Sequence, residues 1–153
     1  MINNCGELSR LKNQRYFGSC NGGWAYDAYP ELETLDAGRC ITIADIKGPA
    51  VITNIHSTQH FPSMRDNKAS EDEHKAISAR GVILEIYYND IVTPAVRVPL
   101  GDFFGDGCGG KAGHFSTLFV EKAPESYNCF IPMPFEKSVR VILKNETSYN
   151  LSN

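Results

Sequence analysis

The stretch Gly81-Val82-Ile83-Leu84-Glu85-Ile86-Tyr87-Tyr88 decides the fold class, because its apolar residues alternate with a period of two. One face of an extended chain would carry Val82, Leu84, Ile86 and Tyr88, and the other Ile83, Glu85 and Tyr87. β-branched and aromatic residues in this alternation are typical of a strand packed on a core. The Asn89-Asp90 pair that follows is a turn signal. The stretch therefore predicts a β-strand over residues 81–88.

Turn residues separate six further stretches of the same kind, which are residues 39–46, 50–57, 95–100, 116–120, 127–131 and 138–143. The last of them alternates Val139, Val141 and Leu143 with Arg140 and Ile142. Long helical patterns are missing, and the charged segment 64–79 is typical of an insertion that forms a solvated loop or a short surface helix. Short strands without helices predict an all-β fold, an antiparallel sandwich or barrel.

Composition fits an ordinary globular chain. The 153 residues are 22% charged and 42% hydrophobic, which predicts one domain over residues 1–153. A net charge of −3 argues against a nucleic-acid partner. The sequence has no run of eighteen apolar residues, and its start lacks the basic and apolar regions of a signal peptide. We therefore expect no membrane contact and a cytoplasmic location.

The five cysteines, Cys5, Cys20, Cys40, Cys108 and Cys129, form no Cys-x-x-Cys pair, so they predict reduced thiols and no zinc site. Cys40 and Cys129 lie in apolar stretches and are predicted to be buried. His56 and His60 are four residues apart in a strand context, where that spacing spans about 13 Å and excludes a shared ion. We expect neither a metal nor another cofactor.

The most unusual segment is the glycine-rich loop over residues 101–113. Carboxylates beside aromatic rings suit sugars, because rings stack on C–H faces and carboxylates accept hydrogen bonds from hydroxyl groups. The alternative is a strand-exit loop whose phenylalanines plug the core and whose Asp102 caps a turn. Asp102 with Asp106 or Glu85 could also form a glycosidase pair, although the spacing does not require it. The candidate sugar-binding or active-site residues are Asp102, Phe103, Phe104, Asp106 and His114.

A second aromatic loop surrounds Trp24, together with Tyr26 and Tyr29. It predicts either a hydrophobic lid over the sheet or a sugar platform, so Trp24 joins the candidate residues.

Four blocks, at residues 43–55, 84–88, 96–105 and 127–135, together resemble a known family. The most specific parts are Pro99-Leu100-Gly101-Asp102-Phe103-Phe104-Gly105 and Asn128-Cys129-Phe130-Ile131-Pro132-Met133-Pro134-Phe135. They resemble the furanose-cleaving glycoside hydrolases, which include α-D-fructofuranosidases and D-arabinofuranosidases and were long catalogued as a domain of unknown function. The resemblance runs from about residue 8 to residue 146. It implies the first of two tandem jelly rolls, a fold related to viral capsid proteins, in trimers or hexamers.

This sequence also departs from the pattern of the family. The resemblance implies that the acidic catalytic residues lie in the second half of family members, near a Gly-Thr-Glu-Asp-like block. This sequence lacks that block, so no catalytic residue is assigned. We expect a single jelly-roll antiparallel β-sandwich of about eight strands, without the second catalytic half. It would be a glycan-binding or self-assembling module and a homo-oligomer, trimer or higher. The alternatives are an active furanoside hydrolase with carboxylates at a subunit interface, or one half of a split enzyme.

Overall fold

The computed structural model describes residues 34–58, 77, 79–107, 113–123 and 126–152. Their secondary structure is almost entirely strand, which confirms the all-β prediction. The strands are β1 (Thr34–Leu35), β2 (Cys40–Lys47), β3 (Ala50–Ile52), β4 (Ile55–Thr58), β5 (Val82–Tyr88), β6 (Val96–Pro99), β7 (Phe115–Ser116), β8 (Val120–Ala123), β9 (Ser126–Cys129), β10 (Met133–Phe135), β11 (Ser138–Asn145) and β12 (Leu151–Ser152). One short helix, α3 (Leu100–Phe103), follows β6, and residues 79–81 form a helical turn before β5.

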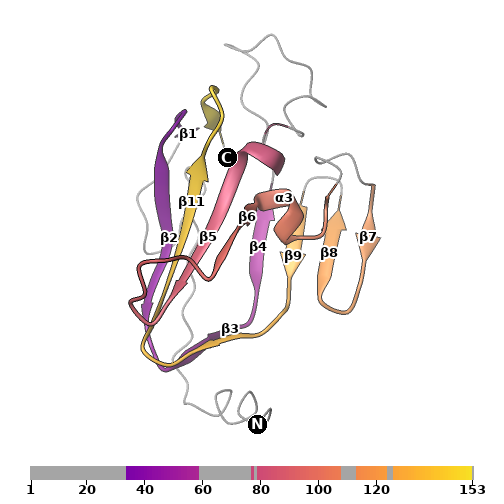
Figure 1. Ribbon diagram of the computed structural model, residues 1–153. Coiled ribbons are helices and arrows are strands. Elements are labelled where there is room, and N and C mark those ends of the chain that lie inside the picture. Colours follow the sequence, from indigo (N-terminus) through magenta and orange to yellow (C-terminus); the bar gives the residue numbers. More distant parts are fainter. Residues whose placement is uncertain (1–33, 59–76, 78, 108–112, 124–125, 153) are drawn as a thin grey trace.

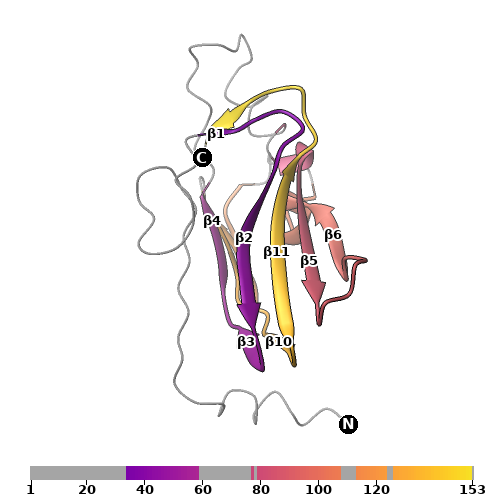
Figure 2. The ribbon, with the colours of Figure 1, turned by 90° about the vertical axis from the view of Figure 1, so that its left-hand side faces the viewer.

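Two four-stranded antiparallel sheets form the two layers of a sandwich, as Figures 1 and 2 show. The first has the order β2-β11-β5-β6 and the second β4-β9-β8-β7. The short pairs β3-β10 and β1-β12 extend the structure at its ends. The eight strands of the two main sheets confirm the predicted jelly-roll sandwich of about eight strands.

The register of the first sheet shows which of its side chains face the core. Val141 lies opposite Ile86 and Leu143 opposite Leu84, and all four side chains are buried. Tyr127 and Cys129 of the second sheet belong to the same hydrophobic cluster. The period-two pattern of residues 81–88 and 138–143 therefore marks the inner face of the sandwich.

Three sequence predictions need correction. The predicted strand 116–120 is wrong, because residues 117–119 turn the chain between β7 and β8, and the Thr117 hydroxyl binds both the carbonyl and the N–H of Val120 at 2.8 and 2.9 Å. The predicted strand 50–57 is two strands, β3 and β4. Cys40 is exposed rather than buried, because it starts β2 on the outer face opposite Lys144. Cys129 is buried as predicted.

Several predictions fall on residues that the structure does not describe. Trp24, Tyr26 and Tyr29 lie outside the described residues, as does most of the predicted insertion 64–79. Within the described part of the chain, no helix is long and apolar enough to cross a membrane.

Candidate functional site

The carboxylates of the glycine-rich loop point to different partners. Asp102, in the first turn of α3, forms an ion pair with Nη1 of Arg80, a residue of the helical turn before β5. The Asp102 carboxylate is about three-quarters buried, whereas half of the Arg80 side chain is exposed. Asp102 therefore ties the loop to the start of β5, and none of the described cap hydrogen bonds of α3 involves its side chain.

Asp106 is completely buried. It forms an ion pair with Lys122 of β8, and the Tyr127 hydroxyl of β9 donates a hydrogen bond to Oδ2 at 2.8 Å. The Phe104 ring stacks on the Tyr127 ring with 5.1 Å between centroids, and Phe103 packs edge-on against Phe104 at 5.0 Å. Gly105 allows this tight exit because its φ of +83° suits glycine. These contacts agree with the alternative prediction of a strand-exit loop whose phenylalanine side chains fill the core. Because Asp106 is buried among them, its carboxylate is not accessible to a ligand at the surface.

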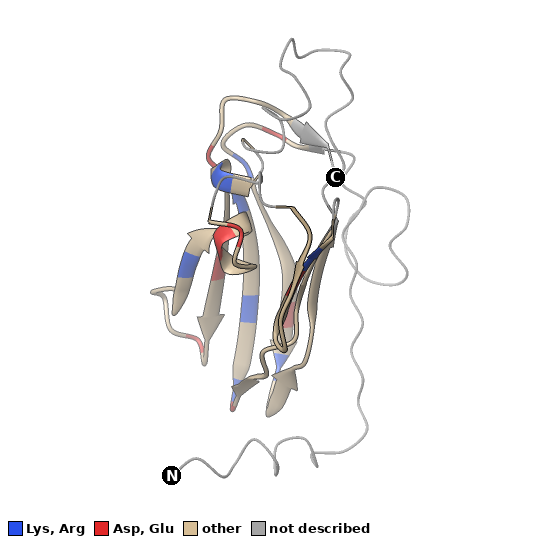
Figure 3. Cartoon of the chain, turned by 90° about the vertical axis from the view of Figure 1, so that its right-hand side faces the viewer, with Lys and Arg blue, Asp and Glu red and all other residues tan. Residues whose placement is uncertain are grey.

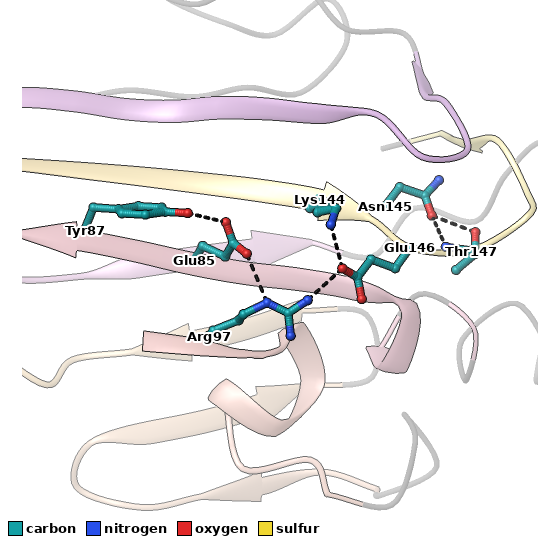
Figure 4. A network of polar contacts seen from close by, with 7 residues as sticks. All are labelled: Glu85, Tyr87, Arg97, Lys144, Asn145, Glu146 and Thr147. Atoms are coloured by element: carbon teal, nitrogen blue, oxygen red, sulfur yellow. Dashed lines mark hydrogen bonds and ion pairs between the residues drawn. The ribbon is translucent and has the colours of Figure 1, made fainter. Parts of the chain in front are cut away.

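Glu85, the third carboxylate considered from the sequence, lies in a surface network on the outer face of the first sheet (Figure 4). It accepts hydrogen bonds from Tyr87 at 2.6 Å and from Arg97 at 3.1 Å. The hydrogen bond from Tyr87 to Glu85 raises the pKa of the Tyr87 phenol. Arg97 also binds Glu146, whose pKa is lowered chiefly by the hydrogen bond from Lys144. Each of these three carboxylates, Asp102, Asp106 and Glu85, thus forms an ion pair with a different basic side chain.

His114 belongs to a row of polar side chains that crosses the second sheet. His56 Nδ1 lies 2.8 Å from the Asn128 side-chain oxygen, and Asn128 Nδ2 lies 3.5 Å from Glu121 Oε2. Glu121 Oε1 lies 3.9 Å from His114 Nε2. The four residues come from β4, β9, β8 and the segment before β7, which lie side by side in Figure 1. We call His56, Asn128, Glu121 and His114 the polar row.

The polar row lies on the outer face of the sheet. Tyr127 and Cys129 of β9 are buried, so Asn128 between them faces the other way. Glu121 lies directly opposite Asn128 in the ladder, and His56 lies opposite it on the other side. The charged residues on the strands of this sheet are Glu121 and the buried Lys122, and most of the charged positions coloured in Figure 3 lie elsewhere in the molecule.

Two exposed phenylalanines adjoin the polar row. The Phe130 N–H donates to the Phe119 carbonyl at 2.7 Å, which extends the β8-β9 ladder by one pair. Phe119 is 48% exposed and Phe130 is 44% exposed. Phe119 belongs to the turn before β8 and Phe130 directly follows β9, so both exposed rings lie at the end of the two strands that carry Glu121 and Asn128. Exposed aromatic surface therefore adjoins the polar row.

The sequence alone indicated only His114 of this site. His56 was considered for a metal, and Asn128 and Glu121 gave no signal because single polar residues on the outer face of a strand are common. Only the register of four strands brings them together. Among the described residues, no group of three or more His, Cys, Asp or Glu side chains could hold a metal ion.

The strand order, the buried loop after β6 and the polar outer face define an antiparallel jelly-roll protein. Residues 29–153 match the family model described as GH172 domain-like, so the chain belongs to this glycoside-hydrolase-related family. A comparison with the curated proteins found no match.

Proposed function

We propose that the chain is a carbohydrate-binding jelly-roll module, and that furanose-containing glycans bind across the outer face of the sheet β4-β9-β8-β7. The observation that carries this proposal is the polar row beside the exposed pair Phe119 and Phe130. Membership of a glycoside-hydrolase-related family supports a sugar as the ligand class.

The chemistry of the face suits a sugar chain. Sugar hydroxyl groups both donate and accept hydrogen bonds, and the amide of Asn128, the carboxylate of Glu121 and the two imidazoles supply both kinds of partner. The phenylalanine rings offer flat apolar surface for the C–H face of a sugar ring. A flat strand face can bind successive sugar units, whereas a deep pocket would hold one.

Calorimetric titration with arabino- and fructo-oligosaccharides tests the proposal. Replacing both rings (Phe119→Ala with Phe130→Ala) is expected to weaken binding about tenfold or more, because stacking surface is lost. Ile131→Ser is the matched control, since Ile131 follows Phe130 and is equally exposed at 45%. The proposal fails if wild-type protein binds none of these oligosaccharides, or if the control loses as much affinity as the double variant.

Hydrolysis by this chain is the second candidate, and the charges argue against it. Asp102, Asp106 and Glu85 are paired with Arg80, Lys122 and Arg97, respectively. Release of sugar from aryl furanosides by the wild-type chain, lost in Asp102→Asn, would favour the hydrolase instead. As one half of a split enzyme, the chain would need a second polypeptide before any sugar is released.

We also propose that the chain forms a homo-oligomer, trimer or higher. Val92, in the turn between β5 and β6, is 89% exposed, and Ile91 beside it and Leu118 are exposed as well. Large apolar side chains in such positions favour contact with another protein surface. Sedimentation equilibrium should show the oligomer for wild-type protein and smaller species for Ile91→Ser with Val92→Ser; a monomeric wild type contradicts it. The cytoplasmic location stays a prediction from the sequence.

A further inference from the structure

The second sheet carries a buried lysine on the inner face of β8. The Lys122 side chain is only 4% exposed, and its Nζ is in contact with Oδ2 of the completely buried Asp106. Lys122 lies directly opposite Tyr127 in the β8-β9 ladder and opposite Phe115 in the β7-β8 ladder. Because paired strands hold the lysine on both sides, the sheet restricts the position of its amine.

The Asp106 carboxylate is held in place from the other side of the contact. The Asp106 N–H donates to the Gly101 carbonyl at 2.8 Å, and the Gly105 N–H donates to the Asp102 carbonyl at 3.0 Å, so the chain after α3 is tied to the helix. The Tyr127 hydroxyl donates to Oδ2 at 2.8 Å. Two groups held in contact in this way can react without the entropic cost of being brought together.

The surroundings of the pair are apolar and aromatic. The completely buried Phe104 ring stacks on the Tyr127 ring, and Lys122 Nζ lies 5.4 Å from the centroid of the Tyr127 ring. Keeping two charges away from water is costly, and transfer of one proton from the ammonium group to the carboxylate removes both charges. That transfer leaves a neutral amine, the nucleophilic form of lysine, beside a neutral carboxylic acid.

We propose that Lys122 and Asp106 join spontaneously in an amide bond, which cross-links β8 to the segment after α3. A proton passes from Nζ to Oδ2, and the Nζ lone pair then attacks Cγ. Oδ2 leaves as water with that proton and a second proton from Nζ, while the hydroxyl of Tyr127 assists its departure by donating to it. The chain loses one water molecule, and no oxidant, reductant or cofactor takes part. The ion pair is the state from which the reaction starts.

Intact mass spectrometry of the denatured full chain tests the cross-link. We expect the purified folded protein to be lighter than its sequence by one water molecule. A trypsin digest should contain a branched fragment that joins positions 106 and 122, because trypsin does not cleave after an acylated lysine. The Asp106-Gly107 step can also lose water by closing a ring onto its own backbone, but that product leaves Lys122 free for trypsin. The fragment map therefore separates the two reactions.

Variants test the role of each group. Lys122→Arg keeps the positive charge without a nucleophilic amine, so it should retain the full mass. Tyr127→Phe keeps the stacked ring and removes the hydroxyl, so the loss of water after refolding from urea should be about tenfold slower or more. Lys144→Arg is the matched control, because Lys144 Nζ also contacts a carboxylate, Glu146 Oε1 at 2.8 Å, but at the surface. This control should lose water as the wild type does.

A full mass in the folded wild type overturns the proposal. So does a digest without the branched fragment, or a loss of water that persists in Lys122→Arg. An unchanged rate in Tyr127→Phe contradicts the assisting role of the hydroxyl. The branched fragment of the wild type decides the matter even where a variant fails to fold.

Discussion

Asp106 joins the segment after α3 to the second sheet. Its partners Lys122 and Tyr127 are also buried, and each lies next to a member of the polar row, Glu121 or Asn128. The buried contacts on the inner face thus fix the strands whose outer face we propose to bind glycans. A buried ion pair need not stabilise a fold relative to apolar residues, but removing one partner leaves a costly buried charge.

We therefore predict that Asp106→Asn lowers the free energy of unfolding by about 3 kcal/mol or more, because Lys122 keeps a buried charge. Urea unfolding measures the change. Asp102→Asn, in a more exposed ion pair, should cost about 1 kcal/mol or less. Equal losses for the two variants would show that the burial of Asp106 does not matter.

Glu146 provides a pH-dependent test on the surface. Its pKa lies below the ordinary value of 4.5, chiefly because Lys144 donates a hydrogen bond to the carboxylate. A lowered folded-state pKa contributes stability above the unfolded-state pKa, and that contribution is lost as the pH falls through the folded-state pKa. The stability difference between wild type and Glu146→Gln should therefore shrink as the pH drops below about 4.5. A difference independent of pH between 7 and 3, measured by urea unfolding, contradicts this assignment.

At the scale of elements, the end of β11 is organised by one buried amide. Asn145 donates to the Leu35 carbonyl at 2.8 Å and the Tyr149 carbonyl at 2.7 Å, and accepts from the Thr147 N–H and hydroxyl at 2.9 and 2.6 Å. It thereby connects β1, the end of β11 and the turn that leads to β12. The Asn145 side chain is completely buried, and no local sequence pattern indicates this role.

Asn145→Ala should lower the free energy of unfolding by about 3 kcal/mol, because it leaves buried carbonyl and N–H groups without partners. Hydrogen exchange should accelerate most at the amides of β1 and β12. Asn128→Ala, a partly exposed asparagine on the outer face, should cost about 1 kcal/mol or less. Unchanged exchange in β1 and β12 would argue against the organising role.

The close approach of Gly81 to the turn after β11 gives a second test at this scale. Gly81→Ala should destabilise the protein by about 1–3 kcal/mol, because the new methyl group meets the Thr147 methyl group. Thr147→Ser removes that methyl group and keeps the hydroxyl that binds Asn145. Combined with Gly81→Ala, it should restore most of the loss in thermal unfolding; additive losses in the double variant would contradict the contact.

At the scale of the whole molecule, the sequence predicted the sandwich because alternation is a local property. Residues 81–88 and 138–143 show which side chains face the core, and the structure agrees. The turn at residues 117–119 was missed because a Thr117 side chain, rather than glycine or proline, closes it. The site was less predictable, since Asp102 and Asp106 look paired in the chain but bind Arg80 and Lys122.

The polar row could not be predicted, because it depends on how four strands align. His56 and Asn128 are 72 residues apart in the chain, yet their side chains are in hydrogen-bond contact. A strand pattern predicts which face a residue takes, but not which residue lies beside it on the next strand. The proposed function therefore depends on the register of the second sheet more than on any motif.

Mapping of amide shifts during titration with an arabino- or fructo-oligosaccharide tests that function most directly. We predict that the largest saturable shifts fall on the outer face of β4-β9-β8-β7, at His56, Glu121 and Asn128 and at the phenylalanine pair. Phe119→Ala with Phe130→Ala should raise the oligosaccharide concentration needed for half-saturation of these shifts about tenfold or more, while leaving the amides of the first sheet unchanged. Saturable shifts confined to other surfaces, or none with any oligosaccharide, would contradict the assignment of this face as a glycan-binding site.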